Sequence, residues 1–313
     1  MLRSDSTEPP PAIGIRGVTR RFGAVAAVDN FSLDVGRGEI FALTGPDGAG
    51  KTTLIRLICG ALALDEGSLR VDGVDVVAQT ARVQGAIGYM PQRFSLYPDL
   101  SLMENLAFYG EIFGVPAREF EARARSLLTE FSLWEFRTRL AEELSGGMKQ
   151  KLALACTLVH RPATILLDEP TAGVDPVSRR ELWRILYRIN RGGTTIFLST
   201  PYMDEAELSD RVALMIRGSL VQCGTPDAIK AAIDGEVVEV VCRDRAVARR
   251  ALAALPEVRS VEIFGETLHA LVDSAQAAIP QISRALADAG VADARLMRIA
   301  PTVEDAFVAR LTA

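Results

Sequence analysis

The chain has 313 residues, of which 49% are hydrophobic and 24% are charged, and its formal net charge is −5. This length allows one large domain and one small domain, and the composition is that of an ordinary globular protein. The negative charge excludes a bulk attraction to nucleic acid or to anionic lipid, so we expect no nucleic-acid partner.

Cysteine and histidine usage argues against a disulfide framework or a histidine-rich metal site. The cysteines are far apart, and three of them lie in apolar runs, which favours buried thiols in a reducing compartment. They are Cys59, Cys156, Cys223 and Cys242. The only histidines are His160 and His269. No uncharged apolar stretch approaches about 18 residues and residues 1–11 have no apolar core, so we expect a cytosolic chain. Any membrane role must therefore come through a partner.

The N-terminal third reads mainly as strands. Residues 1–12 are polar and rich in proline, and we expect them to be disordered. A connection at Arg20–Gly23, which contains Phe22, separates the first two expected strands, and Asp72-Gly73 predicts a hairpin. The strands expected here are Ile13–Val18, Phe31–Val35, Ile40–Leu43 and Ile87–Gln92.

Residues 93–160 read as a helical subdomain. Ser101 and Glu104 form a capping-box pattern that opens a helix over Leu102–Phe113. Two more helices are expected, at Pro116–Phe131 and Met148–Val159.

Two nearly all-apolar runs follow, Thr164–Leu167 and Thr194–Leu198, with a helix over Pro176–Asn190 between them. Segments that are apolar on both faces and flank a helix are typical of central parallel strands. A last strand pair is expected at Arg211–Ile216 and Ser219–Cys223.

A boundary near residues 233–235 separates a large N-terminal domain, residues 13–233, from a smaller C-terminal domain, residues 234–313. The latter shows a β-α-β-β-α-β order, which predicts a ferredoxin-like fold. Thr302 is expected to cap a final helix, and His269 is expected on an exposed face because it alternates with apolar neighbours. We find no catalytic constellation in this domain.

The segment GPDGAGKT fits G-x-x-x-x-G-K-[ST], a loop whose backbone N–H groups bind a polyphosphate. Its glycines permit backbone conformations that a Cβ would obstruct. Lys51 is expected to place a positive charge at the β/γ-phosphates, and Thr52 to supply an oxygen to Mg²⁺. The expected nucleotide-binding residues here are Gly45, Pro46, Asp47, Gly48, Ala49, Gly50, Lys51, Thr52 and Thr53.

Two further patterns carry candidate chemistry. The apolar strand Ile165–Leu167 ends in Asp168, which can hold Mg²⁺ directly or through water, and Glu169, which can polarise a water. The alternative is a helix-capping Asp-Glu pair. Ser145 followed by two glycines at a helix start predicts a second anion site, and the alternative is an ordinary Ser-capped helix.

The order of these motifs resembles the ATP-binding cassette (ABC) ATPases across about Ile13–Gly224. The resemblance rests on the phosphate loop, Gln92 after a strand, Leu144–Gly147, Ile165–Pro170 and Ala172–Asp175. It implies a P-loop NTPase cassette, an α/β fold whose mixed sheet carries a helical insertion.

The resemblance also implies a role for each matching residue. Phe22 would stack on adenine, Gln92 would contact Mg²⁺ and the γ-phosphate, and Glu169 would be the general base. Thr52, Gln92 and Asp168 would hold the metal, so ATP and Mg²⁺ are the implied cofactors. A second cassette, in a homodimer or heterodimer, would present its nucleotide to Leu144, Ser145, Gly146, Gly147, Gln150 and Asp175.

The chain departs from the family at two positions. Where the family usually shows a histidine that reaches the γ-phosphate, Pro201 offers no donor, and the contact is lost unless Ser199, Thr200 or Tyr202 replaces it. Losing such a donor can cost ~10² to 10³ in rate. Pro201 also fits the first position of a helix capped by Thr200. Asp47 replaces the common asparagine, with at most a modest expected loss of nucleotide affinity.

We therefore expect a chain that binds MgATP, hydrolyses it slowly in its own site and lends Ser145–Gly147 to a competent partner site. The Tyr202–Glu207 stretch and the C-terminal Pro301–Asp305 look most like ATPases of the ABC-2 export class, which includes multidrug and daunorubicin resistance.

Such a subunit would dock on a separate transmembrane permease near Gln92–Phe113, at the inner face of the cell membrane. Two alternatives are a nucleotide-gated regulatory subunit that hardly hydrolyses ATP and a cassette acting on ribosomes or DNA. The single cassette, the net charge of −5 and the lack of a basic tail argue against the last.

Overall fold

The computed structural model describes residues 10–93 and 96–312, which form two compact units, one ending at Cys223 and one beginning at Gly224. The expected disorder of residues 1–12 falls mostly on residues 1–9, outside the described residues. Ala12 is buried, and its N–H donates to the carbonyl of Val35 at 2.9 Å, so it belongs to the folded unit. Among the described helices, none combines the length and apolarity needed to cross a bilayer.

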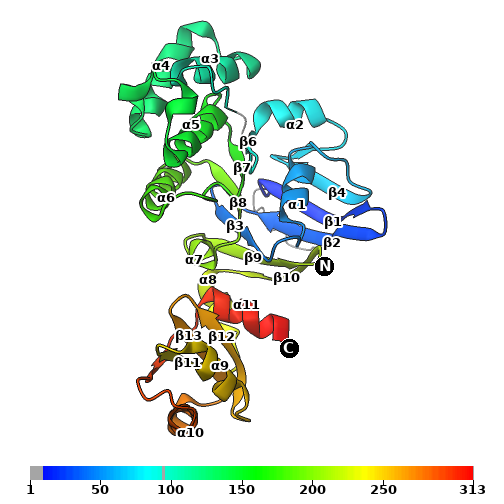
Figure 1. Cartoon of the computed structure of the whole chain (residues 1–313). Helices are drawn as coiled ribbons and strands as arrows, with labels where there is room; N and C mark the ends of the chain where they lie inside the picture. Colours follow the sequence, from blue (N-terminus) through cyan, green and yellow to red (C-terminus); the bar gives the residue numbers. More distant parts are fainter. Residues whose placement is uncertain (1–9, 94–95, 313) are drawn as a thin grey trace. The chain divides into compact units, whose positions relative to one another are not determined.

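Two sheets frame the N-terminal unit (Figure 1). The first has the order β2-β1-β4-β5 and is antiparallel. Its strands are β1 (Ile13–Phe22), β2 (Val25–Val35), β4 (Glu66–Val71) and β5 (Val74–Asp75). Pairing of β1 with β2 continues to Phe22 and Val25, so the expected connection at Arg20–Gly23 is wrong: only a turn of two residues, Gly23 and Ala24, separates the strands. Asp72 and Gly73, both with positive φ, form the predicted hairpin turn.

The second sheet has the order β10-β9-β3-β8-β7-β6 and carries the candidate motifs. Its strands are β3 (Ile40–Thr44), β6 (Gly88–Met90), β7 (Thr164–Asp168), β8 (Thr195–Thr200), β9 (Arg211–Ile216) and β10 (Ser219–Gly224). The strands β3, β8 and β7 are parallel neighbours and every residue in them is buried. This confirms the central parallel strands predicted from the apolar runs.

Helix α1 (Lys51–Ile58) follows the phosphate loop and packs in the core shared by both sheets, through Leu54, Ile55, Leu57 and Ile58. The expected helical subdomain contains α3 (Leu102–Ile112), α4 (Ala117–Glu130) and α5 (Gly146–Leu158). The capping box of α3 is confirmed, because the Glu104 N–H donates to Ser101 Oγ at 3.2 Å and the Ser101 N–H to Glu104 Oε2 at 2.7 Å. The other helices of this unit are α2 (Thr80–Ala86), α6 (Pro176–Arg191) and α7 (Met203–Ala206), and 3₁₀ turns lie at Trp134–Phe136 and Ala141–Glu143.

The C-terminal unit has the predicted ferredoxin-like order, and its sheet runs β12-β13-β11-β14 with every neighbour antiparallel. Its strands are β11 (Glu236–Val241), β12 (Val258–Phe264), β13 (Thr267–Val272) and β14 (Arg295–Ile299). Its helices are α8 (Pro226–Ala231), α9 (Arg245–Ala253), α10 (Ala275–Asp288) and α11 (Val303–Thr312). Because α8 packs against α11, the unit begins before the boundary expected at residues 233–235.

His269 is buried, so the expectation of an exposed-face histidine is wrong. Only 9% of it is exposed, its ring stacks on Phe264 with centroids 4.1 Å apart, and Nδ1 lies 2.9 Å from Asp305 Oδ1. The other carboxylate oxygen of Asp305 accepts from the N–H and the hydroxyl of Thr302, both at 2.7 Å. Thr302 in turn accepts the Asp305 N–H at 3.1 Å, which confirms it as the cap of α11. This cluster fastens α11 to the sheet.

We expect Asp305→Asn to loosen α11 at neutral pH. Burial by itself raises the pKa of Asp305, but hydrogen bonds from His269 and Thr302 outweigh it, so the pKa lies below its ordinary value of 3.8. A group with a lowered folded-state pKa stabilises the fold fully above its ordinary pKa and loses that contribution as pH falls through the folded-state value. The variant should lose about 2 kcal/mol at pH 7.

Peptide-level hydrogen exchange over α11 at a series of pH values, with each rate corrected for the intrinsic exchange rate at that pH, measures this effect. The gap between wild type and Asp305→Asn should shrink as the pH falls below 3.8 toward the lowered folded-state pKa, because the unfolded segment protonates first and the folded carboxylate follows. Asp288→Asn, at an exposed position of α10, is the matched control. Equal protection of α11 in wild type and Asp305→Asn at pH 7 would contradict the role of this cluster.

Candidate functional site

The phosphate loop runs from the end of β3 to the start of α1, and its glycines all have positive φ: +151° at Gly45, +77° at Gly48 and +107° at Gly50. A Cβ on Gly50 would lie 2.1 Å from the carbonyl oxygen of Ala27, and one on Gly45 equally close to that of Met215. Any side chain at these two positions would therefore clash with fixed backbone. The loop has the glycine-dependent conformation that the sequence predicted.

A cavity of about 520 Å³ opens beside this loop, a size suited to a small-molecule ligand. Lys51 is only 5% exposed, and its Nζ donates to the carbonyls of Gly45 at 2.7 Å and Pro46 at 3.1 Å. The cavity combines loop residues with side chains from four other segments. It is lined by Ala27, Asp47, Gly48, Ala49, Gly50, Lys51, Thr52, Thr53, Gln92, Glu169, Ala172, Pro201 and Tyr202.

Asp168 is buried at the end of β7 beside Thr52. Its Oδ1 accepts from the Thr52 hydroxyl at 3.1 Å and from the Ser199 hydroxyl at 2.7 Å, whereas its Oδ2 has no hydrogen-bond partner among the described residues. Gln92 donates through Nε2 to Glu169 at 2.8 Å, which leaves the Gln92 amide oxygen as an acceptor. Carboxylate, hydroxyl and amide oxygens are the ligands that Mg²⁺ prefers, so Thr52, Asp168 and Gln92 fit the metal that the sequence implies.

Glu169 faces the cavity from a strained backbone position. Its φ is +49°, a left-handed conformation that a side chain larger than hydrogen disfavours. Its N–H donates to Ser199 Oγ at 3.0 Å, so one hydroxyl touches both acidic residues of the pair.

The pKa of Glu169 is raised, chiefly by burial and further by the charges of Asp168 and Asp47. Lys51 and the hydrogen bond from Gln92 act in the opposite direction without cancelling the shift. A carboxylate with a raised pKa accepts a proton more readily, which is the property that a general base needs.

The residues expected to contact a second nucleotide lie together but outside this cavity. The Ser145 hydroxyl accepts the Met148 N–H at 3.3 Å at the start of α5, and Asp175 accepts the N–H groups of residues 177 and 178 at 3.0 Å at the start of α6. A Cβ on Gly147 would lie 2.5 Å from Ser178 Oγ, so the two helix starts are in close contact. The residues of this group are Leu144, Ser145, Gly146, Gly147, Gln150 and Asp175.

Phe22 does not line the cavity either. It ends β1 at the tip of the hairpin with β2, is 49% exposed, and has the Arg20 guanidinium 5.0 Å from its ring centre. An exposed aromatic ring at this tip is free to stack on a flat ligand group.

Pro201 lines the cavity, but it does not begin a helix. Helix α7 starts at Met203 after Tyr202, so the expected helix from Tyr202 with Thr200 as its cap is wrong. The Thr200 hydroxyl instead accepts the Tyr202 N–H at 3.1 Å and donates to Glu205 at 2.7 Å. This hydroxyl therefore accepts and donates at the same time, and the helix begins later because the backbone of Tyr202 is extended, with φ −92° and ψ 116°.

Ala27 and Ala172 in the cavity wall, and the structural roles of Ser199 and Glu205, were not predicted from the sequence. Ala27 has no polar group and lies in no motif, and Ala172 was noted only as part of the Ala172–Asp175 motif. Ser199 could have been predicted, because it lies at the end of a strand that is expected to run parallel to the one that ends in Asp168 and Glu169. The burial of Glu205 depends on residues distant in sequence and could not.

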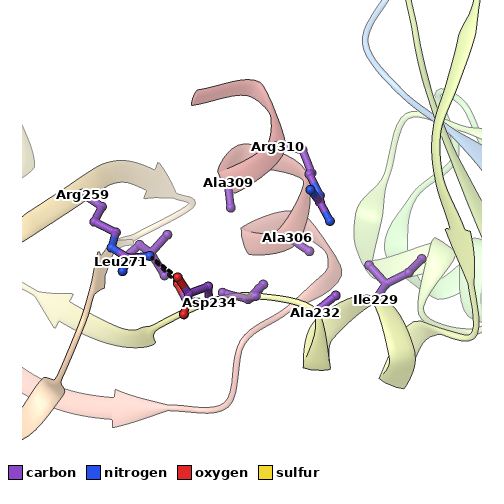
Figure 2. A pocket seen from close by; sticks show the side chains of 9 residues that line it. Ile229, Ala232, Asp234, Arg259, Leu271, Ala306, Ala309 and Arg310 are labelled. Carbon is purple, nitrogen blue, oxygen red and sulfur yellow. Dashed lines mark hydrogen bonds and ion pairs between the residues drawn. The ribbon is translucent and has the colours of Figure 1, made fainter. Parts of the chain in front are cut away.

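A second cavity, of about 300 Å³, lies in the C-terminal unit (Figure 2). Arg259, in its wall, donates to the Asp234 carbonyl at 2.8 Å and to its carboxylate at 3.1 Å, and also pairs with Asp273. The charge of this guanidinium is already balanced by the carboxylates of Asp234 and Asp273, so it is not available to bind an anionic ligand. The catalytic candidates therefore remain those of the N-terminal unit.

Comparison with known proteins identifies the family. A family model described as ABC transporter matches residues 28–172. The probable multidrug ABC transporter ATP-binding protein YbhF of Escherichia coli is 40% identical over 227 residues, which cover 72% of this chain and 39% of that protein. The daunorubicin resistance ATP-binding protein DrrA3 of Streptomyces coeruleorubidus is 36% identical over 299 residues, 95% of each chain. The Nod factor export ATP-binding protein I of Rhizobium etli is 38% identical over 314 residues, which cover 99% of this chain and 96% of that protein.

Solved structures agree with these relatives. The structure of an ATP-binding subunit of an ABC transporter matches with a TM-score of 0.65 at 28% identity, covering 70% of this chain and 92% of that chain. A dimeric ATP-binding cassette in a post-hydrolysis state, bound to ADP and Pi, matches with a TM-score of 0.62 at 25% identity, covering 68% of this chain and 98% of that chain. With the phosphate loop and the paired acids at one cavity, these matches show that the chain belongs to the ATP-binding proteins of ABC transporters.

Proposed function

We propose that this chain is the ATP-hydrolysing subunit of an ABC-2 type exporter and that it drives a separate membrane permease. The observation that carries the proposal is the meeting of Lys51, Thr52, Gln92 and Glu169 around one cavity beside a glycine-dependent phosphate loop. The relatives named for multidrug, daunorubicin-resistance and Nod factor export favour export over other ABC activities. The expected place of the subunit is cytoplasmic and peripheral, at the inner face of the cell membrane.

The proposed reaction uses these residues in order. The backbone N–H groups of residues 47–53 bind the phosphates of ATP, and Lys51 turns its ammonium group to the β/γ oxygens. Glu169 accepts a proton from a water whose oxygen attacks the γ-phosphorus, and the bond from that phosphorus to the bridging oxygen breaks, leaving ADP and phosphate. Gln92 orients Glu169 through the hydrogen bond of 2.8 Å. Mg²⁺, held by Thr52, Asp168 and Gln92, would neutralise charge developing on the phosphates.

A second cassette completes the proposed site. Ser145–Gly147 and Asp175 form their own surface at the starts of α5 and α6, outside the cavity that holds Lys51. A helix N-terminus with free N–H groups favours a phosphate, so this surface suits the nucleotide of a partner cassette. Phe22 would stack on adenine from its exposed hairpin tip.

The presence of Pro201 favours a model in which this chain hydrolyses ATP slowly in its own site and pairs with a second cassette whose site is competent. It lines the cavity and has neither an N–H nor a polar side chain to offer a phosphate. The same observation supports a second candidate function, that of a nucleotide-gated regulatory subunit with little hydrolysis. Activity of the assembled complex separates the two functions.

The affinity-tagged chain should copurify with an integral membrane permease from detergent-solubilised membranes, and this complex should hydrolyse MgATP. Lys51→Ala should weaken MgATP binding about 10- to 100-fold, because it removes a charge-assisted contact to the phosphates, and should lower hydrolysis by the complex. Fluorescent-nucleotide titration and phosphate release measure the two effects.

Lys230→Ala, in α8 of the C-terminal unit, is the matched control and should leave both values unchanged. Copurification with ribosomes instead of a permease would contradict the exporter assignment. If Lys51→Ala leaves the hydrolysis rate of the complex unchanged, the second candidate function, a regulatory subunit with little hydrolysis, is favoured.

A further inference from the structure

A buried carboxylate joins two segments that border the nucleotide cavity. Glu205, on α7, is 1% exposed, and its Oε2 accepts from the hydroxyl of Thr171 at 2.8 Å and from that of Thr200 at 2.7 Å. The Nε of Arg179 lies 3.5 Å from the other carboxylate oxygen. Burying a carboxylate is costly unless it is paired, and these three groups offset that cost.

The two threonines belong to the segments that carry Glu169 and Pro201. Thr171 lies in a turn closed by the hydrogen bond from the Ala172 N–H to the Glu169 carbonyl, at 3.1 Å. Thr200 is the last residue of β8, directly before Pro201. Glu205 therefore ties the turn of the proposed base to the neighbouring strand end without lining the cavity itself.

Glu169 needs such ties because its backbone is strained. A side chain larger than hydrogen at a φ of +49° persists where the surrounding structure over-determines it. Hydrogen bonds on both sides of the residue do so here. Ser199 Oγ holds the Glu169 N–H at 3.0 Å on one side, and Glu205 holds the Thr171 hydroxyl on the other.

From this geometry we infer that Glu205 is a positioning residue for ATP hydrolysis, which fixes Glu169 in its reactive place through Thr171. The inference rests on the proposed function. Because Pro201 supplies no donor to the phosphate, hydrolysis in this site depends all the more on where Glu169 stands. Glu205 touches neither nucleotide nor metal in this assignment.

Glu205→Ala should lower the single-turnover rate of MgATP hydrolysis about 10²-fold, the cost of misplacing a catalytic group by about 1 Å. The affinity for MgATP should stay within about 2-fold, because the phosphate loop is untouched. Glu205→Gln should recover most of the rate, since its amide oxygen can still accept both hydroxyls. Single-turnover measurement with excess protein resolves the rate even when the wild-type chain is slow.

Thr171→Val tests the route of the effect. It keeps the shape of the side chain and removes the hydroxyl, so it should also lower the rate, and it should cost nothing further in the Glu205→Ala background. Thr157→Val is the matched control, because Thr157 is also buried but its hydroxyl donates to the Ala153 carbonyl within α5. Should Glu205→Ala fail to fold, Glu205→Gln and Thr171→Val still carry the test.

Unchanged hydrolysis in both Glu205→Ala and Thr171→Val, beside an active wild type, overturns the inference and leaves the proposed function standing. Fully additive rate losses in the double variant overturn it as well, because they show that Glu205 acts by another route. A wild-type chain that neither binds nor hydrolyses MgATP overturns the proposed function together with this inference.

Discussion

Glu169→Gln is expected to lower ATP hydrolysis in this chain's own site about 10²- to 10⁴-fold, the range that general-base catalysis supplies. Glutamine keeps the shape of the side chain and an oxygen for the hydrogen bond from Gln92, but it cannot accept the proton of the attacking water. Nucleotide affinity should change little, since the phosphate loop and Lys51 are unaltered. Single-turnover phosphate release and fluorescent-nucleotide titration measure the two quantities.

The same variant should accumulate as an ATP-bound dimer, because nucleotide that binds between two cassettes is no longer consumed. Size-exclusion chromatography with and without MgATP measures the shift. Glu121→Gln, at an exposed position of α4, is the matched control and should behave like wild type. Hydrolysis by Glu169→Gln at the wild-type rate would show that another group takes the proton and would contradict the base assignment.

Local chemistry explains why so much of the fold could be predicted from sequence. The capping box of Ser101 and Glu104 and the Asp72-Gly73 hairpin are decided by neighbours within a few residues. The apolar strands β7 and β8 could be recognised because both their faces are buried, which leaves no alternation. The phosphate loop could be placed because its glycine positions are set by steric contacts.

The prediction failed where distant segments decide a residue's surroundings. His269 was expected to be exposed from its alternation along β13, but α11 brings Asp305, 36 residues later, against its ring. The alternation correctly separates the two faces of the strand, but it does not show that a later helix covers the face that carries His269.

The burial of Glu205 was not predicted for a related reason. A glutamate in a short helix after a strand looks exposed, and its burial depends on Thr171, Thr200 and Arg179 from three different segments. The same carboxylate accepts a hydrogen bond from the hydroxyl of Thr200, the residue that was expected to cap a helix at Pro201.

Pro201→His is expected to raise MgATP hydrolysis by the purified chain about 10-fold or more, toward the ~10² to 10³ that one preorganised donor can supply. Residue 201 lines the same cavity as Lys51, Gln92 and Glu169, so an imidazole there would face the phosphates. Neither neighbouring hydroxyl already does this work, because that of Ser199 donates to Asp168 and that of Thr200 donates to Glu205. Steady-state phosphate release at concentrations high enough for dimers measures the change.

Pro201→Ala separates the gain of an imidazole from the loss of the proline ring. If only histidine raises the rate, the rest of the site is intact and Pro201 slows it, which supports pairing with a competent partner site. If the wild type is already as fast as Pro201→His, another group has replaced the missing donor and the proposal of a slow site is wrong. Tyr202 is the candidate for that group, because it lies in the cavity wall. If the wild type, Pro201→His and Pro201→Ala all bind ATP without hydrolysing it, the missing donor at residue 201 does not explain the lack of hydrolysis. Hydrolysis must then require a partner chain.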